Sequence, residues 1–156
     1  MHNRNKGFSL IELLIVVSII LIIAAIAIPN LLRSRMAANE ASAVGSLRTV
    51  NTACVTYSST YGIGFPTALN NLGTSGPATS TSADLIDNVL AGGVKSGYQF
   101  SYAFTPAVSG VVPAYALHAA PLSPGQTGQR YFFTDQSGVI RFNISAAATV
   151  NDSPIS

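Results

Sequence analysis

The apolar residues of this chain are concentrated in one run near its amino end. Between residues 13 and 32 the sequence contains no Asp, Glu, Lys or Arg. At a rise of about 1.5 Å per residue, a helix of that length crosses a hydrocarbon core of about 30 Å. The pattern therefore predicts one membrane-spanning helix within residues 8–32.

The apolar run continues, without a turn signal, into a segment where apolar residues recur at spacings of three and four. Such spacings are typical of an amphipathic helix, so residues 33–61 are predicted to extend the first helix. The apolar side comprises Ala37, Ala41, Val44, Leu47, Val50, Cys54, Tyr57 and Tyr61, and the polar side Arg35, Asn39, Ser42, Ser46 and Thr49. We predict one helix from about Phe8 to Tyr57, ended by the Gly and Pro residues at 62–66. A small protein cannot cover the first half of such a helix, which must meet lipid or other copies.

Residues 62–97 are predicted to form a connection, because they are rich in Gly, Pro, Ser, Thr and Asn. Within this connection a short helix is expected at residues 84–91. Asp84 would serve as its cap or first-turn acid, and two glycines follow its end.

The last part of the chain has the pattern of β-strands, followed by a tail at residues 146–156. Four runs rich in aromatic and β-branched residues are predicted strands: 98–105, 111–119, 130–135 and 138–143. In the first run, aromatic residues alternate with Gln99, Ser101 and Ala103, which predicts one face toward the helix and one toward solvent. The predicted fold class is α+β: a long amino-terminal helix packed on a small antiparallel sheet at residues 98–145.

Charge is sparse and nearly balanced. Charged residues make up 9% of the chain and the formal net charge is +2. Arg4 and Lys6 carry this excess, so a chain without residues 1–7 would be formally neutral. Nucleic-acid binding needs a basic surface that neutralises phosphates. No direct binding of nucleic acid is therefore predicted.

Candidate catalytic and metal-binding residues are few. The histidines are His2 and His118, and neither belongs to a recognisable nucleophile constellation. Cys54 is the only cysteine, which excludes an intrachain disulfide and favours a packed apolar role. Asp135 and Asp152 are too scattered to predict a calcium site. We expect no enzymatic activity, no cofactor and no metal.

The carboxylate of Glu12 is the anomaly of the apolar run. On insertion scales it costs roughly 2.5–3.5 kcal/mol near the bilayer centre and less near the interface. Cleavage after Gly7 would create an amine on Phe8, one helical turn away on the same face. That amine, or the one of a neighbouring subunit, would neutralise Glu12 and fix the axial register of packed helices. The alternative is a carboxylate at the interface with no specific role.

The residues before the apolar run have the character of a targeting leader. In an ordinary secretory signal the small residue at the cleavage site follows the apolar region, whereas Gly7 precedes it here. Arg4 and Lys6 favour a cytoplasmic amino end, although Arg33 and Arg35 on the other flank weaken the contrast. The globular part is expected outside the cytoplasm.

The stretch from Gly7 through Phe8 to Glu12, followed by an unbroken apolar helix and Pro29, closely resembles the type IV prepilin and pseudopilin family. The resemblance implies that a prepilin peptidase cleaves between Gly7 and Phe8 and methylates the Phe8 amine, while Glu12 guides assembly. It also places Pro29 at the family's helix irregularity, where a kink or local melting is expected. Many pilins carry a helix-interior glycine before that proline, and this run has none.

The resemblance covers about the first thirty residues and leaves several functions open. The leading function is that of a type IV pilus subunit. Residues 1–7 would be its leader, residues 8–32 its spanning segment and residues 33–156 its head. The subunit would first lie in the bacterial inner membrane, where an assembly platform adds it to a homo-oligomeric extracellular filament that serves adhesion, motility or DNA uptake. The alternatives are a type II secretion pseudopilin in a periplasmic filament, a minor pilin, or a single-pass anchor for a binding domain. The anchor alone would tolerate Glu12→Ala and remain uncleaved.

Overall fold

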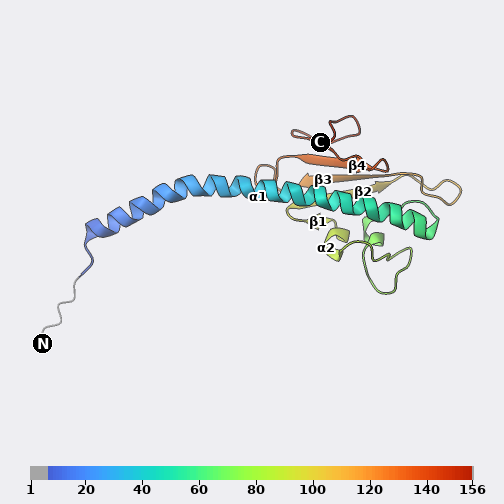
Figure 1. Cartoon of the computed structure of the whole chain (residues 1–156), viewed down its shortest axis with the longest axis horizontal. Helices are drawn as coiled ribbons and strands as arrows, with labels where there is room; N and C mark the ends of the chain where they lie inside the picture. Colours follow the sequence, from blue (N-terminus) through green and yellow to red (C-terminus); the bar gives the residue numbers. More distant parts are fainter. Residues whose placement is uncertain (1–6, 156) are drawn as a thin grey trace. The chain divides into compact units, whose positions relative to one another are not determined.

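A single helix, α1 (Leu10–Tyr61), accounts for the first third of the chain (Figure 1). The computed structural model describes residues 7–155, so the predicted leader lies outside the described residues except for Gly7. The chain divides after Arg35 into two compact units, which are described separately. The helix begins and ends within a few residues of its predicted bounds.

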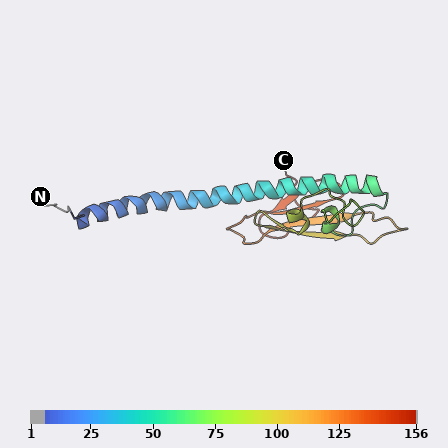
Figure 2. The same cartoon turned by 90° about the horizontal axis from the view of Figure 1, so that it is seen from below.

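The second unit is a two-layer α+β arrangement, as predicted from the sequence. Figure 2 shows the second half of α1 as one layer and the sheet as the other. Between them in sequence lie η1 (Leu69–Leu72) and α2 (Asn88–Ala91). The strands are β1 (Val94–Lys95), β2 (Tyr98–Phe104), β3 (Tyr115–Pro121), β4 (Tyr131–Asp135) and β5 (Arg141–Asn143).

The sheet is an antiparallel meander in the order β1-β2-β3-β4-β5. Each predicted strand run overlaps one of the strands β2 to β5, although β3 begins later than its predicted run and ends two residues beyond it. β1 was not predicted, because two residues, Val94 and Lys95, are too short to show an alternating pattern. The carboxy-terminal tail covers the β5 edge: the Phe142 amide donates to the Ser153 carbonyl at 3.0 Å, and the Ile155 amide to the Ile140 carbonyl at 2.9 Å.

The hydrophobic core lies between α1 and the inner face of the sheet. Of the predicted apolar positions from Leu47 onward, Leu47, Val50, Cys54 and Tyr57 are buried and Tyr61 is half-buried. The core includes Ala43, Leu47, Val50, Ala53, Cys54 and Tyr57 from α1, and Tyr98, Phe100, Tyr115, Leu117, Ala119 and Phe132 from the sheet. This burial supplies the hydrophobic stabilisation of the unit.

The predicted inner face of α1 is wrong in its first turns. Ala37 and Ala41, assigned to the apolar side, are exposed, whereas Ser46, assigned to the polar side, is buried. Glu40 is also buried, with 8% of its surface exposed. The reason is that hydrogen-bond donors from the sheet side lie opposite this part of α1. A carboxylate can therefore be buried here, where the apolar spacing predicted a buried alanine.

The predicted alternation in β2 holds for most of the strand. Tyr98 and Phe100 are buried and Tyr102 is half-buried, but the Phe104 side chain is exposed. The outer face is not simply solvated either, because Phe133 is buried and its ring centroid lies 5.0 Å from that of His118. The sequence pattern therefore identified which face of β2 is buried, but it predicted a longer buried face than the structure has.

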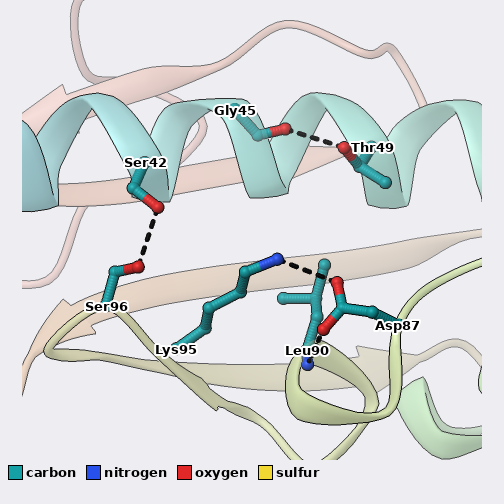
Figure 3. Close-up of polar contacts among 7 residues, drawn as sticks. All are labelled: Ser42, Gly45, Thr49, Asp87, Leu90, Lys95 and Ser96. Carbon is teal, nitrogen blue, oxygen red and sulfur yellow. Dashed lines mark hydrogen bonds and ion pairs between the residues drawn. The ribbon is translucent and has the colours of Figure 1, made fainter.

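The short helix α2 starts later than predicted, and its cap is Asp87 rather than Asp84. Asp84 has a φ of 53°, in the left-handed region, and precedes the helix. The Asp87 carboxylate accepts a hydrogen bond from the Leu90 amide at 3.0 Å and forms an ion pair with Lys95 at 2.8 Å (Figure 3). Lys95 and the Leu90 amide together hold the pKa of Asp87 below its usual value.

Polar contacts fasten α1 to the loops at the edge of the sheet. The Ser42 hydroxyl donates to the Ser96 hydroxyl at 2.9 Å (Figure 3). The Asn39 amide group donates to the Thr127 carbonyl at 2.8 Å. These bonds hold the helix against turns that are distant in sequence.

The strongest of these links is the ion pair between Glu40 and Arg130. The Glu40 carboxylate accepts hydrogen bonds from the Gln129 amide at 2.8 Å, the Arg130 amide at 3.1 Å and Arg130 Nε at 2.7 Å. Burial raises the pKa of Glu40, but these hydrogen bonds outweigh it, so the pKa lies below its ordinary value. The charged carboxylate is thus the form that stabilises the fold.

We expect Glu40→Gln to lower the free energy of unfolding by about 2 kcal/mol at neutral pH, because it leaves the guanidinium facing an amide. Since the folded pKa is lowered, the contribution of Glu40 is complete above its unfolded pKa and is lost as the pH falls through the folded value. The difference between wild type and Glu40→Gln should therefore shrink below about pH 4.5. Chemical denaturation of the full chain in detergent measures both effects.

Asp87→Asn is the matched control for this experiment. Its ion pair is more exposed, and Asn still caps a helix, so the expected change is within about 0.5 kcal/mol. Equal losses in Asp87→Asn and Glu40→Gln would contradict the special position of Glu40.

Gly128→Ala should destabilise the head by about 1–3 kcal/mol through overpacking. A Cβ at Gly128 would collide with the phenol of Tyr98, a fully buried ring whose hydroxyl donates to the Arg130 carbonyl at 2.8 Å. Gly45→Ala is the control: its Cβ would meet nothing within 4 Å on α1. It should stabilise by about 0.5–1 kcal/mol. Unchanged stability of Gly128→Ala in the same denaturation assay would show that the Tyr98 ring can move aside.

Candidate assembly site

The first half of α1 exposes apolar side chains on all sides. Within the described residues, α1 is the one helix long and apolar enough to cross a membrane, and its most apolar window has no buried residue. Leu10 and Ile22, for example, are 80% and 63% exposed. A helix satisfies its own backbone polar groups and therefore suits lipid, where water is absent. The polar Ser18 follows the same rule, because its hydroxyl donates to the Leu14 carbonyl at 2.7 Å.

The helix begins directly after the stretch that contains the predicted cleavage point. Gly7, Phe8 and Ser9 precede α1 without helical structure, and Phe8 is 81% exposed. A Cβ built on Gly7 would meet nothing within 4 Å. The chain itself therefore sets no steric demand for glycine at this position.

Glu12 lies in the first turn of α1 and caps the helix. Its Oε2 accepts a hydrogen bond from the backbone amide of Ser9 at 3.0 Å. This bond satisfies one of the free amides of the helix start, and a negative charge is favourable there because of the helix dipole. Sequence reasoning missed this contact, although the spacing Ser9-x-x-Glu12 is the signature of a capping box.

Pro29 lies inside α1, and the helix continues through it. The proline nitrogen has no hydrogen to donate to the carbonyl four residues earlier, so one helical hydrogen bond is missing there. Local melting is not present in this structure, while a kink at Pro29 stays a prediction.

The head offers no reactive side chain at the positions considered from sequence. Cys54 is fully buried, and this burial raises the pKa of its thiol to about 12. His118 is half-buried in β3 beside Phe133. Cys54 is therefore a packed, protonated thiol at neutral pH.

The two acids considered for calcium lie in different turns and are used there. Asp135 accepts from the Ser137 amide at 2.9 Å, and Asp152 from the Thr149 amide at 2.7 Å. Across residues 7–155, no group of three His, Cys, Asp or Glu side chains is placed to hold a metal ion. Both carboxylates act as turn caps.

Comparison with known proteins supports the interpretation of the amino-terminal segment. A family model described as the prokaryotic N-terminal methylation motif matches residues 2–28. The type IV major pilin protein PilA of Myxococcus xanthus is 48% identical over 52 residues. The type IV wide pilus major component PilA4 of Thermus thermophilus is 66% identical over 38 residues. These matches cover 33% and 24% of this chain, and only 24% and 29% of the two relatives.

A third relative matches over most of its length. The type IV major fimbrial protein FimA of Dichelobacter nodosus is 35% identical over 131 residues, which cover 78% of this chain and 81% of FimA. No solved structure shows a significant match. Because the match to FimA covers more than two thirds of both chains at 35% identity, the chain belongs to the type IV pilin family.

Proposed function

We propose that this chain is a body subunit of a type IV pilus. Its precursor is cleaved between Gly7 and Phe8 by a prepilin peptidase, methylated on the Phe8 amine and anchored in the inner membrane by residues 8–32. An assembly platform then polymerises it into a filament through its amino-terminal helices. The observation that carries this proposal is Glu12, a carboxylate at the start of an exposed apolar helix.

Before cleavage, the nitrogen of Phe8 is an uncharged peptide amide. Glu12 then has the Ser9 amide as its hydrogen-bond donor, at 3.0 Å. Such a bond lowers the cost of the carboxylate but does not neutralise it. Removal of residues 1–7 creates a positive amine next to Ser9. Cleavage therefore gives the chain a positive charge near the carboxylate of Glu12.

In a filament, the exposed apolar helices of neighbouring subunits replace lipid with one another. A carboxylate moved into that apolar environment needs an opposite charge, and breaking a buried pair costs about 3–5 kcal/mol. Pairing Glu12 with the Phe8 amine of the next subunit meets this need at one axial offset only. Glu12 thereby sets the register of addition.

The relatives favour a body subunit over an initiating or tip subunit. Two of them are named as major pilin or major fimbrial proteins and one as a major component of a wide pilus. The head, residues 33–156, would then coat the filament, and the apolar half of α1 would form its centre. This arrangement explains why so many apolar side chains of α1 are exposed in the single subunit.

Glu12→Ala should be cleaved normally yet fail to enter filaments. Co-expressed with its cognate peptidase, wild type should begin at methylated Phe8 in the sheared surface fraction, as measured by mass spectrometry. The variant should stay in the membrane fraction, with sheared material reduced about tenfold or more, since a loss of only about 1.4 kcal/mol in pairing lowers association tenfold.

Two further variants separate the possible causes. Glu12→Gln keeps an acceptor for the Ser9 amide but loses the charge, so it should fail like Glu12→Ala if the ion pair drives assembly. Ser18→Ala removes only a local hydrogen bond on the same helix and should assemble like wild type. Normal piliation by Glu12→Gln would assign the role of Glu12 to the cap instead, and an intact Met1 terminus in wild type would sink the proposal.

Gly7→Val should block processing without disturbing the fold. Because the chain leaves open space around Gly7, any effect of the side chain must arise in the peptidase. The expected product is an uncleaved precursor confined to membranes, with the same melting temperature of the head as wild type. Efficient cleavage of Gly7→Val would contradict the assigned cleavage site.

A further inference from the structure

Arg33 and Arg35 are exposed basic residues directly after the apolar run. The ion pairs among residues 7–155 are Lys95 with Asp87 and Arg130 with Glu40. Neither Arg33 nor Arg35 therefore has an acidic partner in the described part of the chain. Two guanidinium groups at the end of the spanning segment that faces away from the cytoplasm disfavour this membrane orientation, since basic residues favour the cytoplasmic side.

Their distance from Glu12 corresponds to the thickness of a membrane. From Glu12 to Arg33 the helix advances by about 31 Å, at about 1.5 Å per residue. The hydrocarbon core of a bilayer is about 30 Å thick. When Glu12 lies at one edge of the hydrocarbon, Arg33 therefore lies at the opposite edge, among the headgroups.

The two arginines point to different sides of α1. At about 100° per residue, positions 33 and 35 are separated by about 200° around the helix axis. A one-sided protein contact would repeat every three or four residues instead. Charges on opposite sides suit a helix that is surrounded by its ligand, as headgroups surround a spanning helix.

We infer that Arg33 and Arg35 bind the phosphate groups of anionic phospholipids in the leaflet beyond Leu32 and hold the unassembled subunit at this depth. The guanidinium group fits phosphate oxygens bidentately, and its long stem reaches from the helix to the headgroup level. Glu40, the next acid along the sequence, is already engaged by Arg130. The inference rests on the proposed membrane anchoring of residues 8–32.

The experiment places a fluorescent reporter beside the arginines. The chain contains no Trp, so Leu32→Trp introduces a single indole near the outer headgroups. The full chain carrying this reporter is reconstituted into phosphatidylcholine vesicles that contain a minor fraction of phosphatidylglycerol. Quenching by brominated phosphatidylglycerol is compared with quenching by brominated phosphatidylcholine at the same mole fraction. In the sequence, Arg4 and Lys6 precede the apolar run, whereas the reporter is placed at its carboxy-terminal end.

We expect phosphatidylglycerol to be enriched about five- to thirtyfold around the reporter, as two basic residues near an anionic surface would produce. Arg33→Gln with Arg35→Gln should abolish the enrichment, and the double Lys variant should retain part of it. Arg48→Gln, which removes an exposed arginine of the head, should leave it unchanged. Added salt should weaken the enrichment in the wild-type background.

The possible failures are distinguishable. Equal quenching by both brominated lipids would overturn this inference and leave the anchoring intact. An equal loss of enrichment in Arg48→Gln would also overturn it, because the effect would then reflect the general charge of the protein. Absence of quenching by either lipid would show that the helix does not insert, and would overturn the proposed anchoring itself.

Discussion

The hydrogen-bonded ion pair between Glu40 and Arg130 fixes the place where α1 joins the sheet. Glu40 is the first buried residue of the helix in sequence, and its three donors come from the segment that enters β4. The helix cannot slide or rotate against the sheet without leaving a buried carboxylate unpaired, which is among the costlier defects in a protein. The apolar contacts that follow, from Ala43 onward, are thus made in a register that a polar interaction selects.

The two carboxylates of α1 differ in the number of hydrogen-bond donors that their own chain provides. Glu40 is satisfied within its own chain by two amides and a guanidinium. Glu12 has a single amide donor, that of Ser9, and stands on a helix whose apolar surface is otherwise uncovered. One acid completes the folded unit, whereas the other is the acid for which we propose a partner outside the folded chain.

Features encoded by neighbouring residues were predictable, and those that depend on distant partners were not. The long helix, strands β2 to β5 and the Gly7–Glu12 segment follow from local periodicity and motif. The burial of Glu40 was not predicted, because its partner lies 90 residues away in sequence. The cap by Asp87 was also missed, although its hydrogen bond from the Leu90 amide joins residues only three positions apart. The Ser9 to Glu12 cap was local and could have been found.

The carboxy-terminal tail has a consequence for the way in which copies of the head can contact one another. A β-sheet with a bare edge can add strands from other molecules and grow into an aggregate. Here the backbone of residues 153–155 occupies the β5 edge, and at the other edge β1 offers only two residues. Strand addition is therefore blocked on one side and weakly supported on the other. The described sheet thus gives little support to edge-to-edge aggregation between copies of the head.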